Sequence, residues 1–334
     1  MKPFTQLSPR GQRQRLVALA RRALESYDLP VQQVRFFRQE TNALLRVTAQ
    51  MGERFVYRIY SEEDSTLREN QAEMAWLCAL QGQPGLNVVQ PVARRDGAYI
   101  TLAQVAGCEA DGLRRGALFR WLPGRPLADS LTTGGYYQLG QAMAWLHEHA
   151  AGFNLPPELE PKRWDRVFYY VGESVVYNTP AYRHLFTAEQ TAIMDEVVRR
   201  AGVFLAELYA GAPPRLIHGD LHAWNVHVAG GQLYLLDFED IALGHPLQDV
   251  AVTLYYEQDR PDYDALAQAF EQGYSQVRPW PVTARRQLEL LWAARRAMFV
   301  NYVAHTWPQP QEFIQRACVR LGQFLERENG ESSR

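Results

Sequence analysis

The chain has 334 residues and 47% of them are hydrophobic, so it can bury a large core and is too apolar to be disordered. A net charge of −2 provides no field that would draw the protein onto nucleic acid or an anionic membrane. Three scattered cysteines form no disulfide framework, and no uncharged run approaches the ~20 residues of a membrane helix. We therefore expect a cytoplasmic protein with no nucleic-acid or membrane partner.

The first third of the chain is predicted to form an antiparallel sheet with two helices. Ser8-Pro9 begins a helical pattern that ends near Asp28, and strand-like stretches follow at 34–37, 44–48 and 54–60. A capping-box match that starts at Thr66 begins a second helix, which runs through Leu80. Further strands are predicted within residues 98–122.

Beyond residue 122 the pattern changes to long helices. They are predicted at roughly 134–150, 187–209, 245–258, 262–277, 281–305 and 309–327, with one extended passage at 215–240. The change predicts two lobes, a nucleotide-binding lobe at 1–122 and a helical catalytic and substrate-binding lobe at 123–334. The expected fold class is α+β, with a ligand cleft between the lobes.

The most informative passage is LIHGDLHAWNVHVAGGQLYLLDFED, residues 216–240. Its middle predicts a hairpin, with strands on either side of a Gly230-Gly231 turn. A two-residue turn there places residue 225 opposite residue 236, so Asn225 and Asp237 would lie at the same open end. Asp220 precedes the first strand by only a few residues.

These residue types suit phosphoryl transfer, in which positioning and charge neutralisation provide most of the catalysis. One amide oxygen and one carboxylate are ligands that Mg²⁺ accepts beside phosphate oxygens and water, which favours Asn225 and Asp237 as metal ligands. Asp220 would orient the attacking hydroxyl and take its proton, while His218 would hold the loop through hydrogen bonds. The alternative is that these are ordinary polar loop residues.

HGDLHAWNV followed by LLDFED resembles the catalytic and metal-binding signatures of aminoglycoside-phosphotransferase-type kinases. The resemblance implies the two-lobed protein-kinase-like fold, ATP and Mg²⁺ as cofactors, and transfer of the γ-phosphate to the hydroxyl of a small metabolite or a protein serine or threonine. It also implies that Asp220 is the catalytic base, that Asn225 and Asp237 are the magnesium ligands, and that His218 is the leading histidine of the motif.

Other stretches resemble the family in the same order along the chain. The stretch RFVYRIY resembles the strand whose basic residue contacts ATP phosphates, which implies that role for Arg58. The stretch QAEMAWLCAL resembles the helix whose glutamate, here Glu73, pairs with that basic residue. FRWLPGRPL is similar to the linker that holds adenine through backbone groups, at Arg120 and Trp121. GHPLQDVAVTL resembles the segment whose Asp249 braces the catalytic loop.

Two features depart from protein kinases. Arg58 stands where they carry lysine, and residues 36–47 contain no glycine, although the turn Glu40-Thr41-Asn42 resembles the family's own phosphate-covering turn. The departures keep open the alternative that the protein is a nucleotide-binding regulator without turnover.

If the protein is an active kinase, the helical stretch 292–307 bears on its acceptor. This stretch resembles the stress-response Ser/Thr protein kinase branch, which slightly favours a protein serine or threonine as the acceptor. The histidines at 218, 222 and 227 do not match a common zinc spacing.

Overall fold

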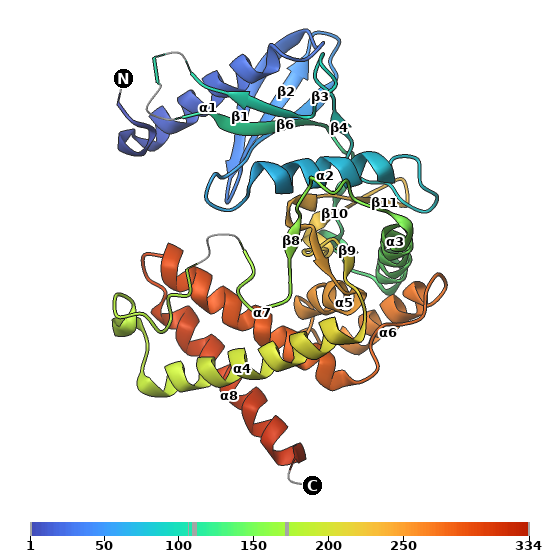
Figure 1. Ribbon diagram of the computed structural model, residues 1–334. Helices are drawn as coiled ribbons and strands as arrows, with labels where there is room; N and C mark the ends of the chain where they lie inside the picture. The colour runs from blue at the N-terminus through green and yellow to red at the C-terminus, as the bar shows by residue number, and fades with distance from the viewer. Residues whose placement is uncertain (1, 106, 109–111, 171–173, 333–334) are drawn as a thin grey trace. The chain divides into compact units, whose positions relative to one another are not determined.

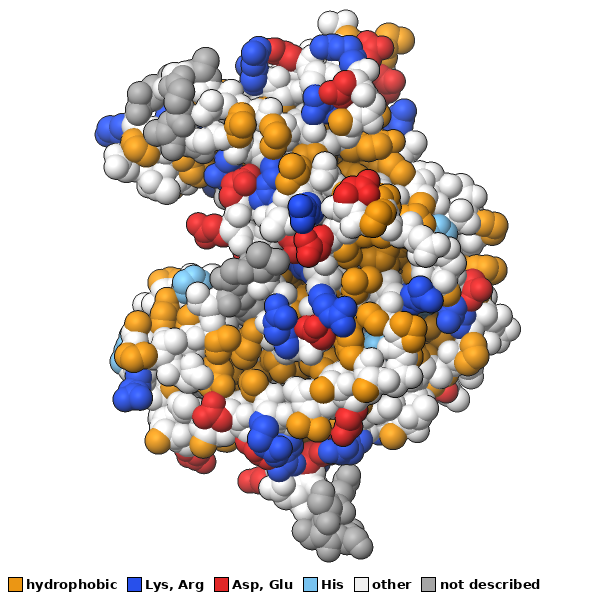
Figure 2. All heavy atoms as spheres, in the orientation of Figure 1, with side chains coloured by type: hydrophobic (Ala, Val, Ile, Leu, Met, Phe, Trp, Pro, Cys, Tyr) orange, Lys and Arg blue, Asp and Glu red, His pale blue; other side chains and the backbone are white. Residues whose placement is uncertain are grey.

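The computed structural model describes residues 2–105, 107–108, 112–170 and 174–332 (Figure 1). The chain divides into two compact units. Unit 1 comprises Met1–Asp129, Asn154–Pro161 and Trp224–Glu239, and unit 2 comprises Ser130–Phe153, Lys162–Ala223 and Asp240–Arg334. Within the described ranges, no helix combines the length and the apolar character that a membrane span needs. Figure 2 shows positive and negative side chains interspersed on one face, in keeping with the small net charge.

Unit 1 is built on a six-stranded antiparallel sheet with the order β1-β2-β3-β6-β4, in which β5 also pairs with β6. The strands are β1 (Val31–Gln39), β2 (Ala43–Ala49), β3 (Arg54–Ile59), β4 (Pro91–Val92), β5 (Ile100–Ala103) and β6 (Arg114–Arg120). Alternate residues of β2, Leu45 and Val47 among them, are buried in one cluster with leucines and alanines of α1 (Pro9–Leu24). The period-two pattern of the strand therefore builds the core of this unit.

The two predicted helix starts of unit 1 are confirmed. The Ser8 side chain accepts a hydrogen bond from the backbone N–H of Gly11 at 3.3 Å, and Pro9 occupies the first turn of α1. At the start of α2 (Leu67–Leu80), Thr66 and Glu69 form both bonds of a capping box.

The described residues also form short 3₁₀ helices in both units. These are η1 (Phe4–Gln6), η3 (Leu127–Ser130), η4 (Arg183–Leu185), η5 (Ala223–Asn225) and η6 (Phe238–Asp240).

A second, three-stranded sheet in unit 1 has the order β11-β10-β7, formed by β7 (Arg125–Pro126), β10 (Val226–Ala229) and β11 (Gln232–Leu235). The predicted hairpin is confirmed: β10 and β11 pair antiparallel, and Gly230 and Gly231 between them have φ of 57° and 77°. Positive φ at both turn residues matches a type I′ turn, which glycine adopts without strain. Because β7 pairs with β10, the hairpin belongs to unit 1, and the division differs from the predicted one at residue 122.

Unit 2 consists mainly of helices, as the sequence predicts. They are α3 (Thr133–Gly152), α4 (Ala188–Gly211), α5 (Pro246–Tyr255), α6 (Tyr263–Tyr274), α7 (Arg285–Thr306) and α8 (Gln311–Ser332). A small sheet of β8 (Lys162–Arg163), β12 (Ala242–Gly244) and β9 (Arg215–Ile217) lies among them. Trp164 and Tyr169 are buried against this sheet, where they stack with a centroid separation of 4.9 Å.

Two glycines allow α3 and α6 to pack closely. A Cβ atom at Gly140 of α3 would overlap the backbone carbonyl of Phe270, and one at Gly273 of α6 would overlap the carbonyl of Tyr137. The obstructing atoms belong to helical backbone, so they cannot move aside as a flexible side chain could. These glycines are therefore required by packing and not by backbone conformation.

Gly273→Ala should lower the free energy of unfolding of unit 2 by about 1–3 kcal/mol, because the methyl group would force the two helices apart. Gly202→Ala is the matched control, since a Cβ atom there meets nothing within 4 Å and α4 would gain a better helix former, by roughly 0.5–1 kcal/mol. Urea unfolding followed by circular dichroism measures both. Equal stability of the two variants would contradict this account of the contact.

Candidate active site

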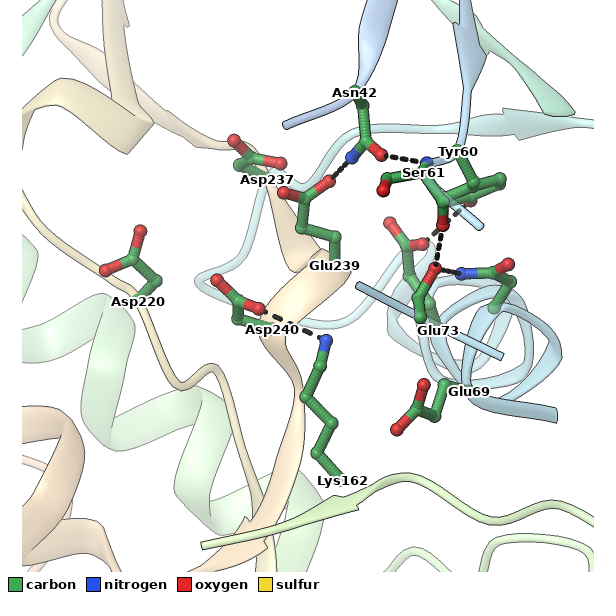
Figure 3. A network of polar contacts seen from close by, with 12 residues as sticks. Asn42, Tyr60, Ser61, Glu69, Glu73, Lys162, Asp220, Asp237, Glu239 and Asp240 are labelled. Carbon is green, nitrogen blue, oxygen red and sulfur yellow. Dashed lines mark hydrogen bonds and ion pairs between the residues drawn. The ribbon is translucent and has the colours of Figure 1, made fainter. Parts of the chain in front are cut away.

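Arg58 of β3 is the centre of a buried ion network within unit 1. Its Nη1 donates to Oε1 of Glu73 at 2.8 Å, and its Nη2 donates to Oδ1 of Asp237 at 2.9 Å. A carboxylate oxygen of Glu239 lies 3.6 Å from Nη1. Figure 3 shows these three carboxylates, which come from α2 and from the segment after β11. The structure therefore brings together Arg58 and Glu73, which the family resemblance pairs, and adds Asp237 to the same network.

The charges of this network are set by burial and by the partners. Glu73 is 1% exposed, and its second oxygen accepts a hydrogen bond from the Tyr60 hydroxyl at 2.8 Å. Burial raises the pKa of the Glu73 carboxyl, an effect that Arg58 and Tyr60 offset in part. Burial alone would lower the pKa of Arg58, but Glu73, Asp237 and Glu239 raise it well above its ordinary value. Arg58 therefore stays cationic although it is buried.

Asn225 and Asp237 flank the open end of the β10–β11 hairpin. Val226 pairs with Leu235, and the backbone N–H of Leu236 donates to the carbonyl of Asn225 at 2.9 Å, so residue 225 lies opposite residue 236. Within the part of the chain that the structure describes, Asp237 is the one non-glycine residue with positive φ, at 61°. Such a conformation costs about 1–3 kcal/mol and is common at functional sites.

The donor set at this hairpin end fits a divalent cation bound together with phosphate. An amide oxygen from Asn225 and a carboxylate from Asp237 are hard oxygen ligands, which Mg²⁺ combines with phosphate oxygens and water. Among the residues described, no three His, Cys, Asp or Glu side chains form a group that could hold a metal by themselves.

Asn42 lies in the glycine-free turn between β1 and β2 and contacts protein groups in unit 1. Its amide nitrogen donates to a carboxylate oxygen of Glu239, and its amide oxygen accepts from the backbone N–H of Ser61 at 2.8 Å (Figure 3). The side chain thus ties the turn to the segment that carries Asp237. Glu239 was not identified from the sequence, although its place in the D-F-E stretch was a usable signal.

Arg120 is the last residue of strand β6, Trp121 follows it, and both belong to the predicted adenine-binding linker. The backbone N–H of Arg120 donates to the carbonyl of Gln90 at 2.9 Å, and that of Trp121 donates to the carbonyl of Arg54 at 3.1 Å. The central carbon of the Arg46 guanidinium lies 4.7 Å from the centroid of the Trp121 ring. Because both N–H groups are used inside unit 1, a donor to adenine would have to come from another residue of the linker.

The loop that carries Asp220 in unit 2 is fixed by Asp249. The two oxygens of this buried carboxylate accept from the backbone N–H groups of His218, at 2.8 Å, and Gly219, at 2.7 Å. His147 Nε2 lies 3.0 Å from one of the same oxygens. Gly219 has φ of 80°, and a Cβ atom there would overlap the carbonyl of Asp240, so the sharp turn requires glycine. These contacts are the ones that a bracing role for Asp249 needs.

His218 is fully buried, and its Nδ1 accepts from the backbone N–H of Asp220 at 3.3 Å. The ring therefore contacts the backbone of the loop, as a residue that holds the loop in place would.

Asp220 itself is held by Arg295, a residue of α7 that sequence reasoning did not single out. Arg295 Nη2 donates to Oδ1 of Asp220, and His222 Nε2 lies 3.3 Å from Oδ2. Burial alone would raise the pKa of Asp220, but Arg295 and His222 more than offset this effect and lower the pKa below the ordinary value of 3.8. The carboxylate is therefore ionised throughout the neutral range.

Lys162 is a second buried cation of unit 2, 4% exposed, and its Nζ donates to Oδ1 of Asp240 at 3.1 Å (Figure 3). The chain contains only one other lysine, Lys2, so the rarity of this residue was the signal by which Lys162 could have been found from the sequence. The pairing gives Asp240, three residues after Asp237, a different partner from the Arg58 network.

Arg58→Met should lower the free energy of unfolding by about 3–5 kcal/mol, because Glu73 would be left buried beside Asp237 without a counter-charge. Arg35→Met, an exposed arginine of β1 in the same unit, is the control and should change stability by no more than about 0.5 kcal/mol. Thermal and urea unfolding measure both variants. If Arg58→Met were as stable as the control, the ion network would not support the fold of unit 1.

Comparison with known proteins identifies the family of the chain. The sequence model of the phosphotransferase enzyme family matches residues 33–280, more than half of the chain. A homoserine kinase from Gluconacetobacter diazotrophicus is 25% identical over 284 residues, which are 80% of this chain and 78% of the relative.

Two solved structures share the fold at lower identity. A microcompartment-associated aminopropanol kinase has a TM-score of 0.74 at 22% identity, with 92% of this chain and 97% of the other covered. The amicoumacin kinase hAmiN, in complex with AMP-PNP, Ca²⁺ and Ami, has a TM-score of 0.74 at 16% identity, with 90% and 91% covered. The predicted protein-kinase-like α+β class is confirmed, and the chain belongs to the phosphotransferase enzyme family.

Proposed function

We propose that this phosphotransferase moves the γ-phosphate of ATP to the hydroxyl of a small metabolite, with Asp220 as base and with Asn225 and Asp237 as ligands of Mg²⁺. The observation that carries the proposal is the register of the β10–β11 hairpin, which brings Asn225 and Asp237 to the same end. Asp220 precedes Asn225 by five residues on a loop held by a buried carboxylate.

The names of the compared proteins support a small acceptor. They are a homoserine kinase, an aminopropanol kinase and an amicoumacin kinase, and one of them was solved with an ATP analogue and a divalent cation. We therefore favour a small hydroxylated metabolite over the protein serine or threonine toward which the C-terminal helices pointed. ATP as the phosphate donor and Mg²⁺ as the metal are parts of the same proposal.

Each residue has a distinct part in the proposed reaction. Bound Mg²⁺ would neutralise phosphate charge and orient the γ-phosphate for in-line attack. Asn225 and Asp237 would hold the ion, and Asp237 has one oxygen, Oδ2, beyond the one that Arg58 contacts. Arg58, kept in place by Glu73, would bind phosphate oxygens, and its planar guanidinium can do so with two parallel donors. Asp220 would accept the hydrogen bond of the acceptor hydroxyl and then its proton.

Asp220→Asn should lower kcat by about 10²–10⁴-fold and leave the Kd of Mg-ATP nearly unchanged, because a base acts mainly in the transition state. Turnover of labelled ATP with a panel of alcohols measures the rate, and calorimetry measures nucleotide binding. A protein that binds ATP but is silent both as wild type and as Asp220→Asn, with every alcohol and protein acceptor tried, would instead be the regulator without turnover.

Asp237→Ala should weaken Mg-nucleotide binding as well as the rate, because it removes one of the two proposed metal ligands. Asp28→Ala, an exposed carboxylate of the same unit, is the control and should bind Mg-ATP as the wild type does. Calorimetric titration with ATP at saturating and at depleted Mg²⁺ separates the metal from the nucleotide. Normal Mg-ATP affinity in Asp237→Ala would contradict the assignment.

If Asp220 is the base, kcat/KM should fall at acid pH only below pH 3.8. Arg295 lowers the pKa of this carboxyl, and the base form is lost only as the pH falls through that lowered pKa. Arg295→Gln removes the charge, so the pKa of Asp220 rises and the acid limb should move to higher pH. Arg296→Gln, the neighbouring arginine that stacks on Tyr255, is the control. An unchanged limb in Arg295→Gln would show that Arg295 does not tune the base.

A further inference from the structure

We infer that Arg295 makes the acceptor site selective for alcohols that carry a negative charge, a carboxylate above all, close to the hydroxyl that receives the phosphate. The inference rests on the proposed function, because it takes Asp220 as the group that meets the hydroxyl. It names the charge of the acceptor, which the family resemblance leaves open. The evidence lies within unit 2, in the guanidinium that contacts Asp220 and in the partners of the neighbouring carboxylates.

Arg295 is buried but uses only part of its hydrogen-bonding capacity. The side chain is 5% exposed. Its Nη2 donates to Oδ1 of Asp220 and also to the Tyr256 hydroxyl, which lies 2.8 Å from Nη2. Nε is buried and has no hydrogen-bond partner among the described residues. An unsatisfied buried donor is costly, so a site that keeps one has a donor available for a ligand. The matching ligand is an acceptor-only anionic group, which the fork of a guanidinium binds well.

Aromatic rings surround the Arg295 guanidinium, which already occupies the position where these rings could bind the cation of a ligand. Its central carbon lies 5.1 Å from the ring centroid of Phe299, 5.3 Å from that of Tyr256 and 5.9 Å from that of Tyr255. Rings of this kind attract cations by their negative faces and exclude water. The protein's own arginine therefore uses the aromatic surface that an ammonium-bearing acceptor would need.

Three carboxylates of unit 2, those of Asp220, Asp240 and Asp249, already have partners. Asp220 pairs with Arg295, Asp240 pairs with Lys162, and both oxygens of Asp249 accept backbone N–H groups. An amine arriving beside Asp220 would meet the charge of Arg295 and would have to displace it from the base. A carboxylate would instead be attracted by Arg295 and leave these pairs in place.

The direct contact between Asp220 and Arg295 also limits the size of the acceptor. A hydroxyl that donates to Asp220 and an anionic group that accepts from Arg295 would both lie within charge-assisted hydrogen-bond distance, about 2.5–2.9 Å, of two side chains that touch each other. The two groups of the acceptor must then be separated by a short chain of carbons. Short hydroxy acids are the class of substrate that fits this geometry.

Three alcohols of similar size test the inference with the full-length protein. These are 3-hydroxypropionate, its neutral isostere 3-hydroxypropionamide, and the cationic 3-aminopropan-1-ol. For the wild type we expect the acid to bind at least about tenfold more tightly than the amide and the amine to bind most weakly, as charge-assisted hydrogen bonds to a buried cation imply. Kd by calorimetry in the presence of Mg-AMP-PNP and kcat/KM by coupled assay are both measured.

Arg295→Gln should abolish the preference for the acid over the amide, whereas Arg296→Gln should keep it, because Arg296 lies on the same helix but has no bond to Asp220. Arg295→Lys keeps the charge without the fork and should keep a reduced preference for the acid, which provides the test if the glutamine variant unfolds. Thermal melting of each variant reports whether it is folded.

The outcomes separate this inference from the proposed function. Acid binding no tighter than amide binding in the wild type, or a preference that survives in Arg295→Gln, would overturn the charge selection even if an amine or a neutral alcohol were phosphorylated normally. If the acid binds through Arg295 but no alcohol gains phosphate, the charge selection would stand and the proposed phosphoryl transfer would be contradicted.

Discussion

The arrangement of the candidate site depends on one tight turn. Two successive glycines with positive φ join β10 to β11 without any extra residue, which fixes which residues of the two strands face each other. A slip of one residue would send the side chain at one end of the hairpin to the opposite face of the sheet. Because the register is fixed, Asn225 and Asp237 share the open end, and the left-handed conformation of Asp237 directs the chain into η6 immediately afterwards.

In each unit a buried arginine contacts one of the candidate site carboxylates. Arg58 contacts Asp237 in unit 1, and Arg295 contacts Asp220 in unit 2. A buried guanidinium is costly unless carboxylates and aromatic faces compensate it, and both arginines have these partners: Phe119 and Tyr60 lie near Arg58, and Phe299 and Tyr256 lie near Arg295. Arg58 in place of lysine is therefore a coherent solution, since its two terminal nitrogens contact Glu73 and Asp237 separately.

Local signals predicted most of the fold, and long-range contacts account for what they missed. Ser8, Thr66 and the double glycine act through bonds to residues only a few positions away, so the helix starts and the hairpin could be predicted. The pairing of β7 with β10 joins residues about a hundred positions apart and was missed, as was the ion pair between Arg295 and Asp220. The position of an arginine in a helix does not reveal which carboxylate it contacts, because that depends on how helices pack.

The central claim is that Asn225 and Asp237 hold the metal that accompanies the nucleotide. A crystal structure with AMP-PNP and Mn²⁺, with anomalous data collected at the manganese edge, tests it most directly. The account predicts a manganese peak within about 2.0–2.3 Å of the amide oxygen of Asn225 and of a carboxylate oxygen of Asp237, with phosphate oxygens among the remaining ligands. A peak bound by the phosphates alone, with both side chains turned away from it, would contradict the claim.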